Sequence, residues 1–386
     1  MKPRILFVAF QSNNESNGGI DSATRMFEAL REDFDWELVT NRESKFTERW
    51  RAGNAQVWLA RSEIGGSRTS RYIGLIKIGV CIWRAIAKRR PDIVHVNDIL
   101  SGIVAARLAR HASIPLVMTV RGLKQAGESY GRRWQFVMSC CFRVVALSDE
   151  MADSLRVRLL FSSSQLLTIR SIVDLDAMSP VDDAARLRLR ESLGIAPDEF
   201  AVASVGAFFP LKGQLRFIQA AVPEVLARIP DARVHFLGDF DPEEDKYSRA
   251  CQFSVNDQGL SKKVKFHGHS DEIAKWYKAC DVIVVHSQRE GLARSMIESM
   301  ACGTPVVSFN VCSATETLDE SAAGIVVEQG DYDQMVSVLR ELASDTARRK
   351  KIGQNARIAA KSMFSKNTIR NKYLFLYREC LSQRSI

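Results

Sequence analysis

The segment DVIVVHSQREGLARSMIESMACGTPVVSF, residues 281–309, contains a strand, a helix and a second strand in succession. Its opening run of apolar, mostly β-branched residues is typical of a strand buried on both faces of a parallel sheet. A polar loop with Gly291 follows, and a helix is expected to begin near Leu292 or Ala293. A Gly-Thr-Pro turn then leads into an apolar strand at 305–309. The segment therefore predicts one βαβ unit of an α/β fold.

The same alternation recurs along the chain and predicts two parallel sheets. The strands expected in the first half are 4–10, 36–40, 92–97, 115–120 and 143–148, with helices at 18–32 and 101–112. The strands expected in the second half are 200–208, 232–239, 263–268, 281–287, 305–309 and 324–328, with a helix from Gln214 to about Ile229. Residues 166–180 lack the pattern and are interpreted as a connector.

These elements predict an α/β fold of two facing, doubly wound Rossmann-like domains with a cleft between them. The first domain is expected at 1–170 and the second at 171–365. A terminal helix within 366–386 is expected to pack back on the first domain. The length of 386 residues agrees with two domains, because a single core rarely grows to that size.

Composition indicates a globular protein of a reducing compartment. Hydrophobic residues make up 46% and charged residues 26% of the chain, which is ordinary for a soluble protein. The eight cysteines include no C-x-x-C pair. The apolar run from Tyr72 is interrupted by Lys77 and Arg84, so no spanning helix is expected. We expect a cytoplasmic location.

The net charge of +9 is concentrated in the first half, where residues 1–170 hold 26 Lys and Arg against 16 Asp and Glu. Such asymmetry indicates either an anionic partner or a generally basic, solvated face. No helix-turn-helix or zinc-finger spacing is evident, so a nucleic-acid partner is not expected. A basic group surrounds the apolar run from Tyr72. Its members are Arg68, Arg71, Lys77, Arg84, Lys88, Arg89 and Arg90. We hypothesise peripheral contact with the inner face of an anionic plasma membrane through this group.

Chemistry is expected at the carboxyl ends of the strands, where ligands of open α/β sheets bind. A glycine pair, Gly18-Gly19, follows the first strand and would let backbone N–H groups approach an anion, although a plain βα loop has the same composition. Lys212 precedes a helix and is suited to bind a phosphate; a solvated loop lysine is the alternative. Glu290 follows a buried strand, and Glu298 lies more than one turn into the next helix. Each glutamate alone is also compatible with a capping or surface acid.

Together these features resemble the E-x7-E signature of nucleotide-sugar glycosyltransferases of family four, the retaining enzymes with the GT-B fold. The resemblance spans nearly the whole chain. It includes the Gly18-Gly19 loop, DIVHVND (92–98), VVALS (144–148), the VG and KG pairs (205–213), KFHGH (265–269), CDVIVVHS (280–287) and Phe364.

The resemblance implies that the second domain binds the nucleotide-sugar donor and the first mainly binds the acceptor. Lys212 would bind the diphosphate, Glu290 the transferred sugar and Glu298 the ribose. The backbone of Gly291, Leu292 and Ala293 would bind the sugar hydroxyls and phosphate, and Gly18 and Gly19 would approach the diphosphate. Separately, His267, His269 and His286 lie near strand ends of the second domain; their spacing fits no metal site, and the first two are expected to line the nucleotide base. The resemblance favours UDP as the carrier.

Two positions depart from the family pattern. The family often has arginine where this chain has Ala207, so one diphosphate cation is missing, and Arg216 or Arg294 could replace it. The family often has histidine where this chain has Arg121. Arginine stays protonated and cannot act as a general base, but it can stabilise negative charge or bind an anionic acceptor.

Two more residues, His95 and Asp98, end another strand of the first domain. Either could contact the acceptor or the sugar, and ordinary hydrogen bonding is an equal alternative for the histidine. No D-x-D motif for a metal is evident, since 239–245 reads as an exposed loop. We therefore expect no cofactor and no required metal.

The expected function is transfer of a sugar to a saccharide or lipid-linked saccharide, in cell-surface polysaccharide or lipopolysaccharide synthesis. Glu290, Lys212 and Arg121 are the expected catalytic residues. Front-face displacement, in which the leaving phosphate takes the acceptor proton, is favoured over a covalent intermediate on Glu290. Two alternatives remain: a phosphorylase or epimerase of the same fold, and a catalytically silent nucleotide-sugar-binding subunit.

Overall fold

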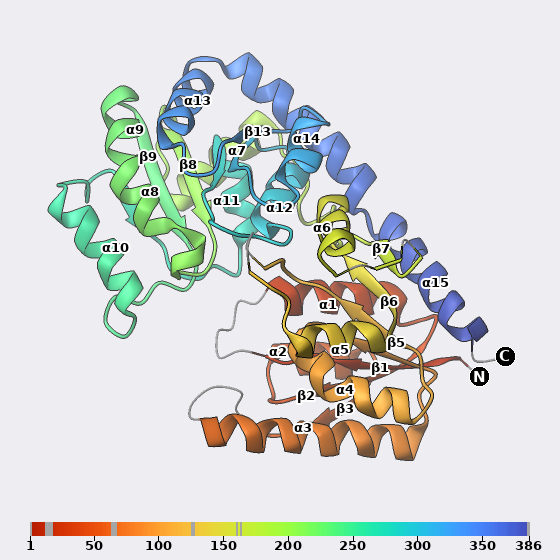
Figure 1. Cartoon of the computed structure of the whole chain (residues 1–386). Helices are drawn as coiled ribbons and strands as arrows, with labels where there is room; N and C mark the ends of the chain where they lie inside the picture. The colour runs from red at the N-terminus through yellow and green to blue at the C-terminus, as the bar shows by residue number, and fades with distance from the viewer. Residues whose placement is uncertain are drawn as a thin grey trace. The chain divides into compact units, whose positions relative to one another are not determined.

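The computed structural model describes residues 2–11, 18–62, 68–124, 128–159, 161–162 and 164–383, with the backbone alone described at 68–71. The chain forms two compact units (Figure 1). Unit 1 contains Met1–Ile172 and Lys366–Ile386, and unit 2 contains Val173–Ser365. The boundary between the units lies two residues after the position expected from the sequence.

Each unit alternates strands with helices. Unit 1 contains β1 (Arg4–Val8), α1 (Gly18–Leu30), β2 (Asp35–Thr40), α2 (Lys45–Ala52), β3 (Gln56–Leu59), α3 (Arg68–Arg89), β4 (Ile93–Val96), α4 (Ile99–His111), β5 (Leu116–Thr119), α5 (Arg132–Cys140), β6 (Cys141–Ala146), α6 (Asp149–Leu159), β7 (Leu166–Thr168) and α15 (Lys366–Ser382). Unit 2 contains α7 (Asp183–Leu193), β8 (Phe200–Val205), the 3-10 helix η1 (Pro210–Lys212), α8 (Gln214–Ala220), α9 (Val222–Arg228), β9 (Ala232–Leu237), α10 (Lys246–Asp257), β10 (Val264–Phe266), α11 (Ile273–Ala279), β11 (Val282–Val285), α12 (Arg294–Cys302), β12 (Val306–Phe309), the π-helix η2 (Thr315–Asp319), β13 (Ile325–Val327), α13 (Tyr332–Ser344) and α14 (Thr346–Phe364).

Both sheets are doubly wound, which confirms the predicted α/β class with two Rossmann-like domains. The strand order is β3-β2-β1-β4-β5-β6-β7 in unit 1 and β10-β9-β8-β11-β12-β13 in unit 2, and the paired strands are parallel. The order reverses between β1 and β4 in unit 1, and between β8 and β11 in unit 2. These two switch points are where sheets of this kind bind ligands.

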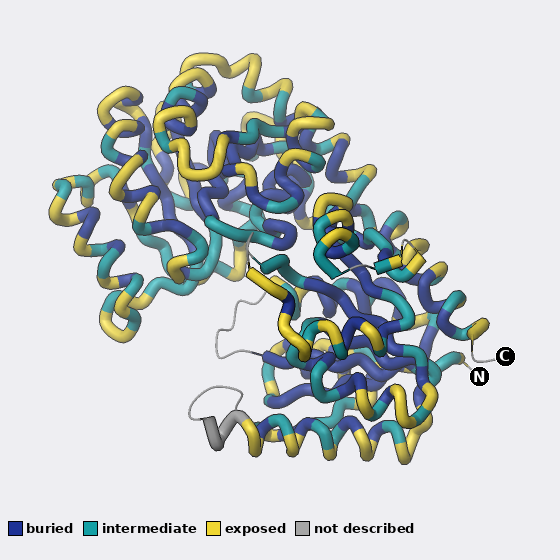
Figure 2. Tube along the Cα trace, in the orientation of Figure 1, coloured by how far each residue is buried: buried dark blue, intermediate teal, exposed yellow. Residues whose placement is uncertain are grey.

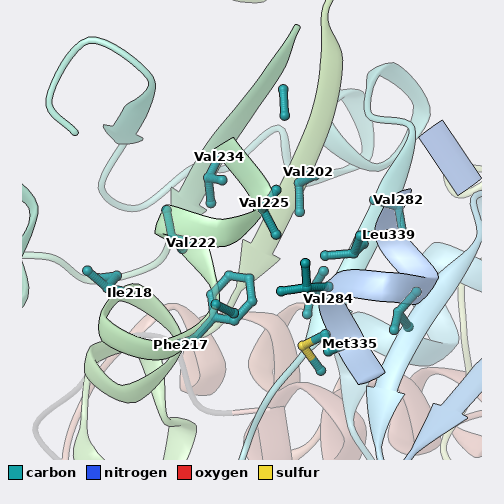
Figure 3. Close-up of a cluster of buried hydrophobic side chains, with 14 of the residues drawn as sticks. Val202, Phe217, Ile218, Val222, Val225, Val234, Val282, Val284, Met335 and Leu339 are labelled. Carbon is teal, nitrogen blue, oxygen red and sulfur yellow. The ribbon is translucent and has the colours of Figure 1, made fainter. Parts of the chain in front are cut away.

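The core of unit 2 explains why its strands read as continuous apolar runs. Val202 of β8 and Val284 of β11 lie on one face of the sheet, among Phe217, Val225 and Met335 from the covering helices (Figure 3). This face is covered by α8, α9, α10 and α13. The helices α7, α11, α12 and α14 pack with one another, and α12 also packs on β11 and β12. Helices on both faces bury both sets of alternating side chains.

The core of unit 1 includes side chains from both ends of the chain. Phe27 of α1 stacks on Trp50 of α2 with ring centroids 4.2 Å apart, and Trp50 also stacks on Phe7 of β1. The terminal helix α15 adds Tyr373 and Tyr377 to this cluster, both of them buried. In Figure 2 buried segments run through the strands of each unit, and exposed segments recur along the outer faces of the helices.

Several elements differ from their expected form. The helix expected from Gln214 to about Ile229 is two helices, α8 and α9, because Pro223 lies at the start of α9 and cannot donate a backbone hydrogen bond. The connector expected at 166–180 begins with a short strand, β7. No expectation covered β3 or α2. All eight cysteines are free thiols. Within the described part of the chain, no helix combines the length and apolar character needed to cross a membrane.

Candidate functional site

Lys212 and Glu290 meet at the switch point of unit 2. Lys212 ends η1, after β8, and Glu290 lies in the loop after β11. The Lys212 ammonium donates to Glu290 Oε1 over 2.6 Å, and the Ser287 hydroxyl donates to the same oxygen over 2.6 Å. The two charged side chains are 26% and 12% exposed. The pair is therefore partly shielded from water, which strengthens its interaction with any charge that binds beside it.

Close packing and a hydrogen bond hold the loop that carries Lys212 against His286, which follows β11. Gly213 has φ of +79°, and a Cβ there would lie 2.5 Å from the His286 carbonyl oxygen, so only glycine fits. His286 Nδ1 donates to the Lys212 carbonyl over 2.9 Å, which leaves Nε2 to accept from the Ser204 hydroxyl over 2.8 Å. Burial lowers the pKa of His286 to about 4, so the ring is neutral. The neutral ring thus fixes the Lys212 backbone.

The helix α12 begins at Arg294, one or two residues later than expected. Its N-cap is Ala293, and no side chain caps the first turn, so the leading N–H groups have no partner from the cap. Gly291, Leu292 and Ala293 are buried in the preceding loop. Such a turn can bind an anion through its backbone.

A small polar cavity lies under this turn and beside Lys212. Its volume is about 10 Å³, near the size that one water needs, and it is lined by Ser204, Val205, Gly206, Lys212, Gln214, Val284, Val285, His286, Ser287 and Ser295. Gln214 donates through Nε2 to the Ala207 carbonyl over 2.9 Å, and its buried Oε1 accepts no hydrogen bond from the described residues. A buried acceptor in this state requires a donor, so a water or a ligand hydroxyl belongs here.

Glu298 lies one turn into α12 with both oxygens engaged. Oε2 accepts from the Tyr277 hydroxyl over 3.2 Å, and Oε1 is paired with the Arg294 guanidinium. Tyr277 is fully buried on α11, and burial raises the pKa of its hydroxyl well above the usual value, so it remains a donor. Glu298 is therefore held in place as an acceptor.

His267 follows β10, at the edge of the same sheet. Its Nε2 is 3.0 Å from His235 Nδ1, and His235 Nε2 is 2.7 Å from Glu199 Oε1. The His267 ring packs on Trp276 with centroids 4.2 Å apart. Burial, and then the charge of His235, lower the pKa of His267 to about 4. The expected contact of His267 with a base remains a prediction.

Arg121 is anchored at the switch point of unit 1. Its guanidinium donates to Asn97 Oδ1 and, over 3.0 Å, to the Ser22 hydroxyl. Asn97 follows β4 and donates to the Gly19 carbonyl over 3.4 Å. Gly18 and Gly19 begin α1, whereas residues 12–17 of the preceding loop lie outside the described residues. The structure thus links Arg121 with the glycine pair through Asn97.

His95 is not available to an acceptor, which corrects the first of its two expected roles. It lies within β4 with 0% exposure, Nδ1 is 2.7 Å from the Tyr377 hydroxyl, and Nε2 is 2.8 Å from the Thr119 hydroxyl. Burial, and then the positive charge of Arg121, lower its pKa to about 3. Both ring nitrogens therefore contact hydroxyl groups of the core, which agrees with the alternative expectation of ordinary hydrogen bonding.

Asp98 caps the helix α4. Its Oδ1 accepts from the backbone N–H of Ser101 over 2.8 Å and from the Ser101 hydroxyl over 2.9 Å. Burial raises the pKa of this carboxyl, although these hydrogen bonds oppose the shift. The capping role alone explains an aspartate here. Contact with an acceptor remains a prediction.

Sequence reasoning missed several residues that support the site. His286 directly follows β11, and from the sequence it was considered only in rejecting a metal site, although a histidine between two strand-end loops can hydrogen-bond both. No sequence pattern pointed to Tyr277, because the sequence of a buried helix does not show which carboxylate a tyrosine hydroxyl contacts. The spacing of Arg294 and Glu298 was readable as an i,i+4 pair.

Comparison with known proteins covers most of the chain. Residues 185–359 match the family described as "Glycosyl transferases group 1", and residues 17–171 match the "Glycosyl transferase 4-like domain". One relative is D-inositol 3-phosphate glycosyltransferase 1 of Catenulispora acidiphila, 29% identical over 281 residues, which are 67% of this chain and 65% of the relative. The matched part thus spans slightly less than two thirds of that relative. Another is UDP-Gal:alpha-D-GlcNAc-diphosphoundecaprenol alpha-1,3-galactosyltransferase of Escherichia coli, 26% identical over 71% of this chain and 73% of the relative.

Two solved structures share the fold. Sucrose-phosphate synthase from Thermosynechococcus elongatus superimposes with a TM-score of 0.84 at 20% identity, covering 99% of this chain and 100% of that one. Anabaena Alr3699/HepE, solved in complex with UDP, gives a TM-score of 0.81 at 20% identity, covering 98% and 100%. At such identity the likeness shows a common fold.

Proposed function

The chain belongs to the group 1 glycosyltransferases with the GT-B fold, and on that premise we propose that it transfers a sugar from a UDP-linked donor to a saccharide or lipid-linked saccharide, with retention of anomeric configuration. The process served is synthesis of cell-surface polysaccharide or lipopolysaccharide. The observation that carries the proposal is the contact of Lys212 with Glu290 at the unit 2 switch point, beside the uncapped start of α12.

Successive parts of the donor would bind to the groups at and beside the start of α12. The diphosphate would accept from the first N–H groups of the helix and from Lys212, which supply positive potential where the leaving group gains charge. The ribose hydroxyls would donate to Glu298, one turn further along. Glu290 would leave Lys212 to orient the transferred sugar. Support for UDP comes from the name of the E. coli relative and from the nucleotide in the Anabaena structure.

We propose that the acceptor attacks the sugar on the face that carries the diphosphate. The bond from the anomeric carbon to the diphosphate oxygen breaks, and the acceptor oxygen bonds to that carbon on the same face. The acceptor proton passes to the departing phosphate oxygen. Glu290 orients the sugar and stabilises its positive charge, and Lys212 balances the diphosphate. No step requires a metal, so we propose that chelators leave transfer unchanged.

Arg121 is proposed to bind an anionic acceptor or to stabilise negative charge. Asn97 and Ser22 hold its guanidinium at the switch point of unit 1. The relatives suit an anionic acceptor, since one is named for an inositol phosphate and another for a diphosphoundecaprenol-linked sugar. Guanidinium binds such groups through paired hydrogen bonds.

Contact with a membrane surface is proposed through the outer face of α3. Five large apolar side chains are exposed there, and Lys77, Arg84, Lys88 and Arg89 lie on the same helix; the apolar five are Tyr72, Ile73, Ile76, Val80 and Trp83. The side chains of Arg68 and Arg71, which belong to the predicted basic group, lie outside the described residues. An apolar face among basic residues suits anionic lipids.

A silent nucleotide-sugar-binding subunit is the second candidate, favoured by Ala207, where a cation of the family pattern is missing. A turnover assay distinguishes the active glycosyltransferase from the silent subunit. Release of UDP from UDP-sugars in the presence of saccharide acceptors would be measured for the parent, Glu290→Gln and Lys212→Ala. We expect release by the parent and a loss of at least a hundredfold in both variants. Full activity in either variant would remove the site assignment, and binding without release by the parent would favour the silent subunit.

A further inference from the structure

Arg294 occupies a position that helix stability does not explain. It is the first residue of α12, where the helix dipole already concentrates positive potential and where a cation is unfavourable. It also precedes its partner Glu298 by four residues, and this order is less favourable than an acid before a base. On α9, Glu224 precedes Arg228 in the favourable order. An arginine at the start of α12 therefore suits an anion bound there.

The Arg294–Glu298 pair is also more buried than a helix-surface pair. The two side chains are 16% and 10% exposed, whereas those of Glu224 and Arg228 are each 49% exposed. Tyr277 occupies the second oxygen of Glu298 over 3.2 Å. Without a ligand, Glu298 therefore has a partner on each oxygen, and one of them must leave before another donor can bind.

An independent sign of a ligand lies beside this turn. The cavity lined by Ser295 of α12 and by Lys212 is also lined by Gln214, whose buried Oε1 accepts no hydrogen bond from the described residues. A bound donor group, either water or ligand, is needed there. The side chain at Ala207, near the same cavity, carries no charge. A diphosphate at this place would have Lys212 and lack a second cation from the loop after β8.

We propose that Arg294 exchanges partners when a nucleoside diphosphate binds. In the free protein it neutralises Glu298. When ribose hydroxyls donate to Glu298, the guanidinium turns to the phosphate oxygens at the start of its own helix and becomes the second diphosphate cation beside Lys212. The inference rests on the proposed function, because it requires a donor at α12. It makes Arg294 both a competitor of the ribose and a ligand of the diphosphate.

This exchange predicts opposite effects on two probes. Calorimetry with UDP, GDP and ADP first identifies the nucleoside diphosphate that the parent protein binds, and the matching nucleoside is then titrated. Arg294→Gln should weaken binding of the diphosphate at least roughly tenfold, the effect of one lost charged hydrogen bond. The same variant should leave nucleoside affinity equal or higher, because Glu298 becomes free. Arg294→Lys, which keeps the charge, should lose less, and Arg228→Gln is the matched control that should change neither.

Each other outcome overturns the inference. If the diphosphate binds Arg294→Gln as tightly as it binds the parent, Arg294 does not contact phosphate. Equal weakening of diphosphate and nucleoside would mean that Arg294 only supports Glu298 or the local fold. Where the parent binds none of the three nucleoside diphosphates, the proposed function itself fails. That result differs from a failure of the exchange alone, in which the parent binds and the variant matches it.

Discussion

Lys212 and Glu290 neutralise each other in the free protein, so their removal should affect binding and turnover differently. Glu290→Gln frees the ammonium, and nucleoside diphosphate should bind as tightly as to the parent or more tightly, while transfer falls at least a hundredfold. Lys212→Ala removes a phosphate ligand and should weaken the same binding roughly tenfold. Calorimetry and a nucleotide-release assay measure both. Equal weakening of binding in the two variants would contradict these roles.

Tyr277 tests whether a residue without ligand contact positions Glu298. Tyr277→Phe removes one hydrogen bond to the carboxylate and keeps the buried ring. Glu298 should then pair more strongly with Arg294, and nucleoside affinity should fall by roughly three- to tenfold, the range for one hydrogen bond. Calorimetry with the nucleoside measures the change. Glu298→Ala should lose at least as much, and a Tyr277→Phe variant with parental affinity would remove the positioning role.

Two buried histidines should make the protein sensitive to mild acid. The folded pKa of His95 is about 3 and that of His286 about 4, both below the ordinary value of 6.5, because burial opposes the charged form. As the pH falls below 6.5 the unfolded chain binds protons that the folded chain does not, so stability falls. When the pH is lowered from 7.5 to 5, each histidine should reduce the free energy of unfolding by about 2 kcal/mol.

Urea unfolding at both pH values measures this loss. In His286→Gln the pH dependence should shrink by about 2 kcal/mol, whatever stability the variant has at pH 7.5. His111→Gln is the control, since His111 is exposed at the end of α4 and should leave the dependence unchanged. An undiminished dependence in His286→Gln would show that the ring does not stay neutral.

At the scale of elements, α12 and α9 show what the sequence can and cannot predict. The spacing of apolar residues and Gly303, which has φ of +73° at the C-cap, place α12 within two residues. The same reasoning joined α8 and α9, because Pro223 was given too little weight against a continuous apolar pattern. The edge strand β3 was missed because its half-exposed residues give no strong alternation. Patterns predict buried elements best.

The site shows the same division between local and long-range information. The strand-end loops carrying Lys212 and Glu290 follow from the order of elements, so their candidacy could be stated from the sequence. The structure adds their direct contact. His95 could not be assigned, because its partner Tyr377 is 282 positions away in the sequence. Hydrogen bonds between distant segments decide such roles, and a single sequence does not contain them.

The exposed face of α3 predicts binding to anionic vesicles. Ile76 and Trp83 are 66% and 58% exposed, and basic residues flank them. Ile76→Ser combined with Trp83→Ser should lower the vesicle-bound fraction at low salt several-fold, because inserted apolar area is lost. Sedimentation with phosphatidylglycerol vesicles measures the fraction. Phe253→Ser, at an exposed position of α10 in unit 2, is the control that should bind vesicles as the parent does. Vesicle binding by the double variant at the parental level would contradict the proposed contact.

For the whole molecule, the terminal helix α15 makes unit 1 depend on both ends of the chain. Five of its side chains are buried in the core of that unit: Ile369, Tyr373, Leu376, Tyr377 and Cys380. Each large apolar side chain contributes about 1.5–3 kcal/mol by burial. Their combined loss is comparable with the total stability of a typical domain, about 5–15 kcal/mol. Truncation after Ser365 should therefore unfold unit 1 and leave unit 2 folded.

Limited proteolysis of the truncated chain tests this dependence. We expect rapid digestion of residues 1–172 and a resistant fragment close to 173–365 that still binds the nucleoside diphosphate, because Lys212, Glu290 and Glu298 all lie in unit 2. Phe375→Ala, at an exposed position of the same helix, is the matched control and should digest as the parent does. Resistance of residues 1–172 after truncation would show that the sheet and its remaining helices suffice, and α15 would then be a cover rather than part of the core.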